Sequence, residues 1–293
     1  MQAMATWLVA RPLHSILALA ATISLAWFSF LSAVVLILLL LQKGVQTAAV
    51  YAVIAGALVT LVGLVVGLSP ANVISQALPI WLPALLLGAI LRVTRSLTLT
   101  LQLSFIIAIA GMLVFFVLVE DATLYWRQLL DQVITVWREA GLHEQADILT
   151  AEKNVLAGQM TMIMTLTLWS VHVVSCVLGY KLYRQLPGRN ADFGLFRNLN
   201  FGRVIAWAMA LVSIGAFVSG AGWVQNTAFI MFAMFWLQGL AIVHWSHAEG
   251  FLPTFALVAT YVLAPVLNVV LIMGLAITGY VDAWFGIRRL KTA

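Results

Sequence analysis

The chain has 293 residues, of which 63% are hydrophobic and only 9% charged, and its formal net charge at neutral pH is +5. Soluble domains carry about 25% charged residues, so this composition excludes a soluble globular protein. The basic residues border apolar stretches, where positive charge orients the chain during membrane insertion and attracts anionic lipids. Because this explains the positive net charge, we expect no binding to nucleic acid.

Long apolar stretches separated by short polar connections predict a polytopic membrane protein. A bilayer needs about 20 apolar residues per helix, and lipid cannot satisfy backbone polar groups, which favours helices. We therefore predict an all-α helical bundle that forms one transmembrane domain over residues 1–293. The eight apolar blocks are Leu13–Leu41, Val45–Leu68, Val73–Leu91, Leu97–Val119, Leu156–Tyr180, Val204–Trp223, Ala228–Trp245 and Phe251–Tyr280.

The first and last blocks are each about 30 residues long, roughly ten more than a perpendicular helix needs. Eight single crossings would also place Arg11 and the basic tail outside, against the positive-inside rule. Ser24, Ser29 and Ser32 interrupt the first block. Pro265 interrupts the last, because proline removes a backbone donor. We expect broken or re-entrant helices that return both termini to the cytoplasm; two long tilted helices are the alternative.

The two longest connections differ in charge. Segment 120–157 holds seven acidic and three basic residues, whereas loop 181–203 holds five basic residues and Asp192 as its single acid. Because positive charge stays in the cytoplasm, we expect segment 120–157 to be extracytoplasmic and loop 181–203 to be cytoplasmic.

Segment 120–157 begins with an amphipathic pattern. Apolar residues recur at three-to-four residue spacing from Asp121, a residue that favours an N-cap, to Gly141, which favours a helix end. The predicted stripe consists of Tyr125, Leu129, Val133, Trp137 and Ala140, broadened by Leu124, Trp126, Leu130 and Ile134. This helix would lie along the outer membrane boundary or cap the bundle, as a lid or as a spacer.

Histidines beside soft or acidic residues are the candidates for a metal site. His172 and Cys176 lie one turn apart and share a helix face, as two metal ligands would. His244 and His247 stand near Glu249, but this spacing lacks the pattern of zinc proteases. Neither set supplies a third helix-borne ligand, so we predict no metal. A buried His172 bonded to a neighbouring carbonyl or hydroxyl is the simpler interpretation.

Amides inside the apolar blocks are the candidates for ligand binding. Asn268 lies three residues after Pro265, near the middle of the last block, where an unpaired polar group is costly. A broken helix with freed backbone groups at mid-membrane is how many transporters bind substrates. We predict ligand contacts at Asn268, Gln238 and His172; a structural kink with Asn268 bonded to another helix is the alternative.

The five basic residues of loop 181–203 are candidates for contact with lipid head groups or with a protein partner. Orientation of the chain by the positive-inside rule would also explain them. They are Lys181, Arg184, Arg189, Arg197 and Arg203.

Catalytic signals are missing from the pattern of polar residues. No acid, base and nucleophile gather at one membrane face, and no acid or base lies deep in any block. We therefore expect neither an enzyme, nor a resident cofactor, nor an ion pump.

The loop YKLYRQLPGRNADFGLFRNLNFGR, from Tyr180 to Arg203, resembles one in a YybS-like family of bacterial membrane proteins of unknown function. That family is distantly similar to the S components of energy-coupling-factor transporters, which implies a helical bundle that encloses a small ligand. The resemblance also implies a location in the bacterial inner membrane. Further residues that fit are Gly279, Asp282, Trp284, Phe285, Arg288 and Arg289, with Gln238, Gly239 and His244.

Our leading hypothesis is a multi-pass inner-membrane protein that binds or transports a small amphipathic molecule, with the break near Pro265 and Asn268 lining the cavity. The alternative is a non-transporting scaffold that docks a cytoplasmic or membrane partner through loop 181–203 and the tail from Asp282 to Lys291. A lipid-modifying enzyme is the weakest of the hypotheses. Membrane lipids are expected partners in each case.

Overall fold

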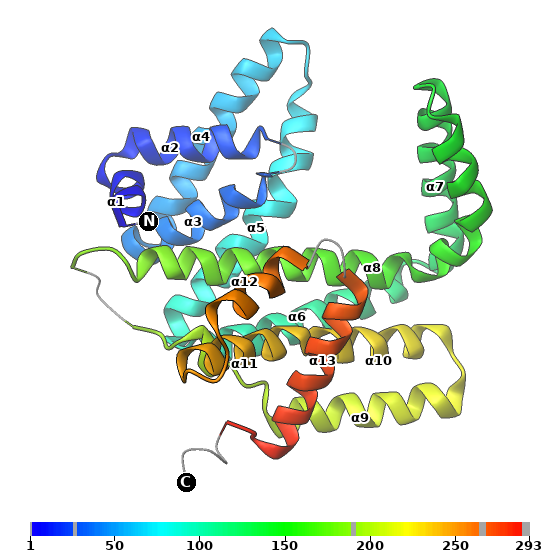
Figure 1. The fold of residues 1–293 in the computed structure, drawn as a ribbon. Helices are drawn as coiled ribbons and strands as arrows, with labels where there is room; N and C mark the ends of the chain where they lie inside the picture. Colours follow the sequence, from blue (N-terminus) through cyan, green and yellow to red (C-terminus); the bar gives the residue numbers. More distant parts are fainter. Residues whose placement is uncertain (1, 26–27, 189–191, 264–267, 289–293) are drawn as a thin grey trace. The chain divides into compact units, whose positions relative to one another are not determined.

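The computed structural model describes residues 2–25, 28–188, 192–263 and 268–288, and the side chain of Asn268 lies outside the described part (Figure 1). The described residues form helices and no strand, which confirms the all-α prediction. Six helical spans in these ranges are long and apolar enough to cross a membrane, or seven if α1 and α2, which are bent by 110°, form one broken span. The chain is therefore a polytopic membrane protein.

The chain divides into two compact units, and unit 1 comprises Met1–Ser104 with Trp169–Phe196. Helix α3 forms its core, because its residues from Ser32 to Leu41 are all buried, and it packs against α2, α4 and α5. A helix that is apolar on every side belongs in such a buried position. The helices of unit 1 are α1 (Gln2–Ala10), α2 (Pro12–Ile23), α3 (Phe30–Lys43), α4 (Val45–Val65) and α5 (Pro70–Thr94), with the start of α6 (Leu97–Leu118) and the end of α8 (His143–Tyr183).

Unit 2 comprises Phe105–Leu168 with Arg197–Ala293. Helices α10 and α11 follow one another as an apolar span, Gly222–Ala248, which is the most buried of the spans. Helix α13 packs on α9, α10 and α11 and runs across them in Figure 1. Besides parts of α6 and α8, unit 2 contains α7 (Ala122–Glu139), the short helix η2 (Phe196–Asn198) at its boundary, α9 (Gly202–Ser219), α10 (Gly222–Met234), α11 (Trp236–Ala248), α12 (Thr254–Leu263) and α13 (Asn268–Phe285). The prediction of one domain over residues 1–293 stays a prediction.

Helices α11 and α13 approach each other at two glycines. A Cβ atom at Gly239 would overlap the carbonyl of Leu275, and one at Gly279 would overlap the carbonyl of Phe235. Small residues let helix backbones come this close inside a membrane, where dispersion contacts replace the hydrophobic effect as the driving force. This contact positions the polar side chains that neighbour the two glycines.

The two overlong blocks are broken, as predicted. In the first, α2 ends before Ser24 and α3 begins after Ser29. In the last, α12 and α13 are separate helices, and Pro265 itself lies outside the described residues. The alternative of a long continuous helix is therefore wrong for the first block, and for the last block the residues between α12 and α13 lie outside the described part. Ser32 is not a break point: it lies inside α3, accepts a hydrogen bond from Trp81 Nε1 at 2.8 Å and donates to the Leu19 carbonyl.

Helix α7 confirms the predicted amphipathic helix and buries one edge of the predicted stripe. Asp121 caps its start by accepting a hydrogen bond from the Leu124 amide at 2.8 Å, and Gly141 follows its end with a φ of +79°. Tyr125 and Leu129, the beginning of the predicted stripe, are exposed. The buried residues are Trp126, Leu130 and Ile134. These three residues are among those that broaden the predicted stripe, and periodicity alone could not show which part of the broad stripe is buried.

The buried face of α7 packs against the first half of α8. Trp126 and Leu130 contact Ala157, and Trp126 Nε1 donates to Thr161 Oγ1 at 2.7 Å. Helix α8 continues unbroken for 41 residues, a length of about 60 Å, against a hydrocarbon core of about 30 Å. The first part of α8 and its partner α7 therefore extend beyond the hydrocarbon.

Candidate functional site

Fully buried polar side chains meet where α11, α13 and the start of α9 come together in unit 2. Gln238 on α11 donates from Nε2 to Asp282 Oδ2 on α13 at 2.7 Å. Its Oε1 accepts the amide of Phe201, just before α9, also at 2.7 Å. Gln238 and Asp282 have no solvent-exposed surface. We call Gln238, Asp282, Arg288 and the backbone of 197–201 the Gln238 network.

Arg288 closes this network from beyond the end of α13. Gly286 takes a φ of +60° and donates its amide to the Asp282 carbonyl, so the chain turns back. The Arg288 guanidinium then reaches Asp282 Oδ2 at 2.7 Å. It also donates to the carbonyls of Arg197 at 2.8 Å and Leu199 at 2.6 Å. Charge-assisted bonds of this kind are stronger than neutral ones, and they hold the entry to α9 against α13.

Asp282 is the buried acid that the sequence analysis missed as a site residue. Its Oδ2 accepts from both Gln238 and Arg288, whereas its Oδ1 is buried and has no hydrogen-bond partner among the described residues. The predicted last apolar block stops at Tyr280, two residues before Asp282, whereas α13 continues to Phe285. The resemblance to the YybS-like family was the signal that could have identified it, because that resemblance includes both Asp282 and Arg288.

The three predicted ligand contacts fall in different places. Gln238 uses both of its polar atoms inside the network. Asn268 begins α13, and its side chain lies outside the described residues. His172 lies in unit 1, and Gln238 lies in unit 2. A ligand-binding role for these residues stays a prediction.

The hydrogen bond of His172 follows from a proline in α5. The Nε2 of His172 lies 3.0 Å from the carbonyl oxygen of Pro79, to which it donates. In a regular helix this carbonyl would accept the amide of residue 83, but residue 83 is proline and has no N–H. The histidine thus satisfies a carbonyl that the helix leaves unpaired, which agrees with the simpler interpretation of a buried histidine bonded to a carbonyl.

The loss of stability caused by removing His172 should therefore depend on Pro83. We expect His172→Ala to lower the free energy of unfolding by about 1–3 kcal/mol, because a buried carbonyl loses its donor. In a Pro83→Ala background the restored amide should serve the Pro79 carbonyl, and the cost of His172→Ala should fall. The measurement is a double-mutant cycle by thermal unfolding in detergent. Pro79→Ala is the matched control, because its amide would serve residue 75; equal costs in the Pro83→Ala and wild-type backgrounds would refute the explanation.

The described basic residues of segment 181–203 are divided between the two units, and their contact with lipid or a partner stays a prediction. Lys181 is exposed within α8, which continues to Tyr183, and Arg184 pairs with Asp192 at 3.5 Å. Arg203 lies within α9, so the connection between the helices is shorter than predicted. Lys181 and Arg184 belong to unit 1, whereas Arg197 and Arg203 belong to unit 2. Arg189 lies outside the described residues.

Asp192 organises the first part of this connection. It accepts the hydroxyl of Tyr180 at 2.7 Å and the amide of Gly194 at 3.1 Å, while the Phe193 amide donates to the same hydroxyl. The ring of Tyr183 lies parallel to that of Phe193, with centroids 6.1 Å apart. Residues 192–194 are thus fixed against the end of α8.

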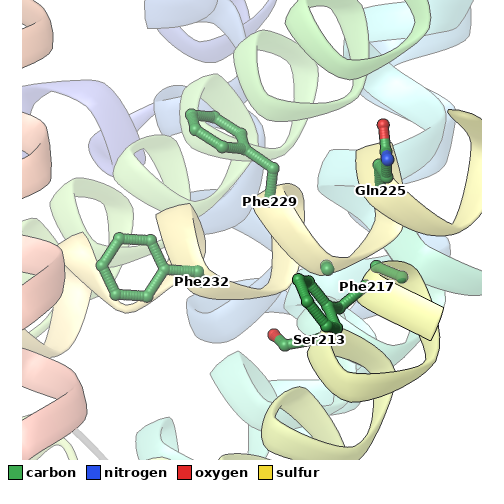
Figure 2. A pocket seen from close by; sticks show the side chains of 7 residues that line it. Ser213, Phe217, Gln225, Phe229 and Phe232 are labelled. Carbon is green, nitrogen blue, oxygen red and sulfur yellow. The ribbon is translucent and has the colours of Figure 1, made fainter. Parts of the chain in front are cut away.

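An open apolar groove lies between α9 and α10. Its volume is about 360 Å³, and in Figure 2 Ser213 and Phe217 project from α9, with Gln225, Phe229 and Phe232 from α10. The buried Ala216 and Ala228 complete the lining. No sequence pattern predicted this groove, because it depends on which faces of the two helices meet.

These features define a class: a polytopic helical membrane protein with a buried polar network and an apolar groove on its surface. The chain belongs to the family described as "Predicted membrane protein (DUF2232)", which matches residues 13–283. Comparisons with curated proteins and with solved structures gave no match. The family match confirms the resemblance to predicted membrane proteins of unknown function, whereas the more distant similarity to S components stays a prediction.

Five of the family-like residues outside the loop come together in the structure. Gln238 bonds to Asp282, and the adjacent Gly239 lies at the close approach of α11 to α13 with Gly279. Arg288 bonds to the same carboxylate. These separate pieces of the resemblance therefore form one structural element, which fastens α9, α11 and α13 together.

Proposed function

We propose that this protein binds a small amphipathic molecule in the bacterial inner membrane, with the apolar part of the ligand in the α9–α10 groove. The groove carries this proposal. Binding sites for small molecules usually enclose about 300–1,000 Å³ and combine an apolar lining with a few polar groups. The groove has a volume of about 360 Å³, three phenylalanines and two polar side chains, Ser213 and Gln225.

The groove is a better candidate for ligand contacts than Gln238. The polar atoms of Gln238 are occupied by Phe201, Asp282 and Asn200, so this amide has little capacity left for a ligand. The groove, in contrast, opens on a hairpin of apolar helices. A ligand that partitions into lipid would reach it sideways from the bilayer, without crossing an aqueous entrance.

The bacterial inner membrane follows from the charge pattern and from the resemblance. Five basic residues gather in segment 181–203, and seven acids lie in segment 120–157. The positive-inside rule then places the first segment in the cytoplasm. The proposed activity is binding rather than catalysis.

Filling the groove tests the proposal. We expect Ser213→Phe to reduce the amount of copurified amphipathic ligand about tenfold, because an added ring occupies the space of an alkyl chain. The measurement is mass spectrometry of the detergent-extracted protein. Val117→Phe is the control, since Val117 on α6 is also in unit 2, 82% exposed and outside the groove. Wild-type ligand content in a folded Ser213→Phe protein would contradict the proposal.

The contacts of Asp192 with the end of α8 favour the scaffold as a second candidate. Asp192 accepts a hydrogen bond from Tyr180 and pairs with Arg184, while Lys181 stays exposed. A preorganised surface loses less entropy when a partner docks. In this case Lys181→Glu should reduce copurification of a protein partner, and Ser213→Phe should leave it unchanged.

A further inference from the structure

A line of exposed apolar side chains runs the length of α9 and begins beside Arg203. Its members follow one another at three-to-four residue spacing, so they share one helix face. Each is more than half exposed, as expected of a face that meets lipid. They are Val204, Trp207, Leu211, Ile214 and Val218, with exposed fractions of 82%, 56%, 62%, 61% and 78%.

Arg203 is held at the end of this line by an aromatic pair. Its Nε donates to the Trp284 carbonyl at 3.3 Å. Trp207, one turn further along α9, packs edge-to-face on Trp284 with ring centroids 4.7 Å apart. Tryptophan and arginine together at a helix end are typical of the membrane–water interface. The geometry therefore marks the start of α9 as the level of the lipid head groups.

The guanidinium of Arg203 has unused donors. The side chain is exposed, and its terminal nitrogens have no hydrogen-bond partner within the described ranges. No acid pairs with it there either, in contrast to Arg184 and Arg288. A guanidinium presents two parallel N–H groups, which match two oxygens of a phosphate. It is thus available to an anion at the membrane surface.

The distance from Arg203 to the groove fits one leaflet of a bilayer. Ser213 lies ten residues further along α9, about 15 Å at 1.5 Å per residue. Half of a hydrocarbon core of about 30 Å is also about 15 Å. Arg203 and Phe217 are fourteen residues apart, close to four full turns, so they lie on the same side of α9. An acyl chain whose head group lies at Arg203 would therefore reach the groove near the middle of the bilayer.

We propose that Arg203 binds the phosphate of an anionic phospholipid whose acyl chain follows α9 into the α9–α10 groove. This inference rests on the proposed function and names the ligand class for the same groove. The charge of Arg203 selects an anionic head group over a zwitterionic one. The exposed line meets the edge of the groove at Ile214 and Phe217, which are neighbours at three-residue spacing. This apolar path from the head-group level to the groove selects a lipid over a free phosphate ion.

The test uses the full chain in nanodiscs that contain equal amounts of phosphatidylglycerol and phosphatidylethanolamine, with native mass spectrometry of the bound lipids. We expect the wild type to retain phosphatidylglycerol preferentially. Arg203→Gln should lower this preference about tenfold, the factor expected for one charge-assisted interaction. Arg138→Gln, which removes another exposed arginine from α7, is the control and should leave the preference unchanged.

Each result separates the two proposals. Loss of both lipids in Ser213→Phe, with loss of phosphatidylglycerol alone in Arg203→Gln, supports both. An unchanged lipid preference in Arg203→Gln overturns the role of Arg203 and leaves the groove intact. Both lipids retained by Ser213→Phe overturn the groove itself. Displacement of phosphatidylglycerol by millimolar inorganic phosphate would show that the ligand is a free ion, which also overturns this inference.

Discussion

A single methyl group at Gly279 should destabilise the protein severely. In Gly279→Ala the new Cβ would overlap the backbone carbonyl of Phe235, and a backbone atom cannot turn aside as a flexible side chain can. Helices α11 and α13 would have to separate, which also moves Gln238 away from Asp282. We expect a loss of more than about 3 kcal/mol, above the usual range for overpacking. Thermal unfolding in detergent and the yield of monodisperse protein are the measurements.

The same helix offers the control. Gly274 lies one turn and a half earlier in α13, and a Cβ there would meet no atom within 4 Å. Since alanine favours helix over glycine by up to about 1 kcal/mol, Gly274→Ala should be neutral or stabilising. The two substitutions thus have opposite expected signs. If Gly279→Ala unfolds no earlier than Gly274→Ala, the close approach of α11 and α13 is wrong.

The second large effect is expected at Arg288. Arg288→Met would leave the Asp282 carboxylate buried with its cationic partner removed, and breaking a buried ion pair in this way costs about 3–5 kcal/mol. The carbonyls of Arg197 and Leu199 would lose their donor as well. We expect a large drop in unfolding temperature and faster proteolysis of the connection before α9.

Two comparisons make this prediction specific. Arg138→Met breaks the exposed pair with Asp147, whose side chain is 73% exposed, and surface pairs contribute at most about 1 kcal/mol. Adding Asp282→Asn to Arg288→Met should recover part of the loss, because the uncompensated charge disappears. Equal costs for Arg288→Met and Arg138→Met would show that the Gln238 network does not stabilise unit 2.

The sequence predicted the helical spans because hydrocarbon imposes length and polarity on every segment separately. The same argument located the two broken blocks, since about 30 apolar residues exceed the thickness of the bilayer. The break between α1 and α2 was missed. There Arg11 is the N-cap and Pro12 occupies the first turn of α2, which is a common helix start. The predicted apolar block begins at Leu13, after these residues, and therefore does not include this helix start.

The candidate site was less predictable because it depends on contacts between distant parts of the chain. Gln238 was recognised as a buried amide, but its partner Asp282 lies 44 residues away. No periodicity within α11 reveals that pairing. The groove has the same origin: Phe217 and Phe229 line it only because α9 and α10 pack with these faces turned outward. The resemblance in the tail pointed to the correct residues without revealing their geometry.

The Gln238 network also sets an order of events during synthesis. The carbonyls of Arg197 and Leu199 leave the ribosome first, and the guanidinium that satisfies them follows 91 and 89 residues later. Until Arg288 is synthesised, helices α9, α10 and α11 therefore lie in the translocon or in the lipid with an incomplete Gln238 network. Arrival of Arg288 completes it. In a nascent chain that stops before this residue, the Asp282 carboxylate would lack its cationic partner, so maturation of unit 2 depends on the synthesis of Arg288.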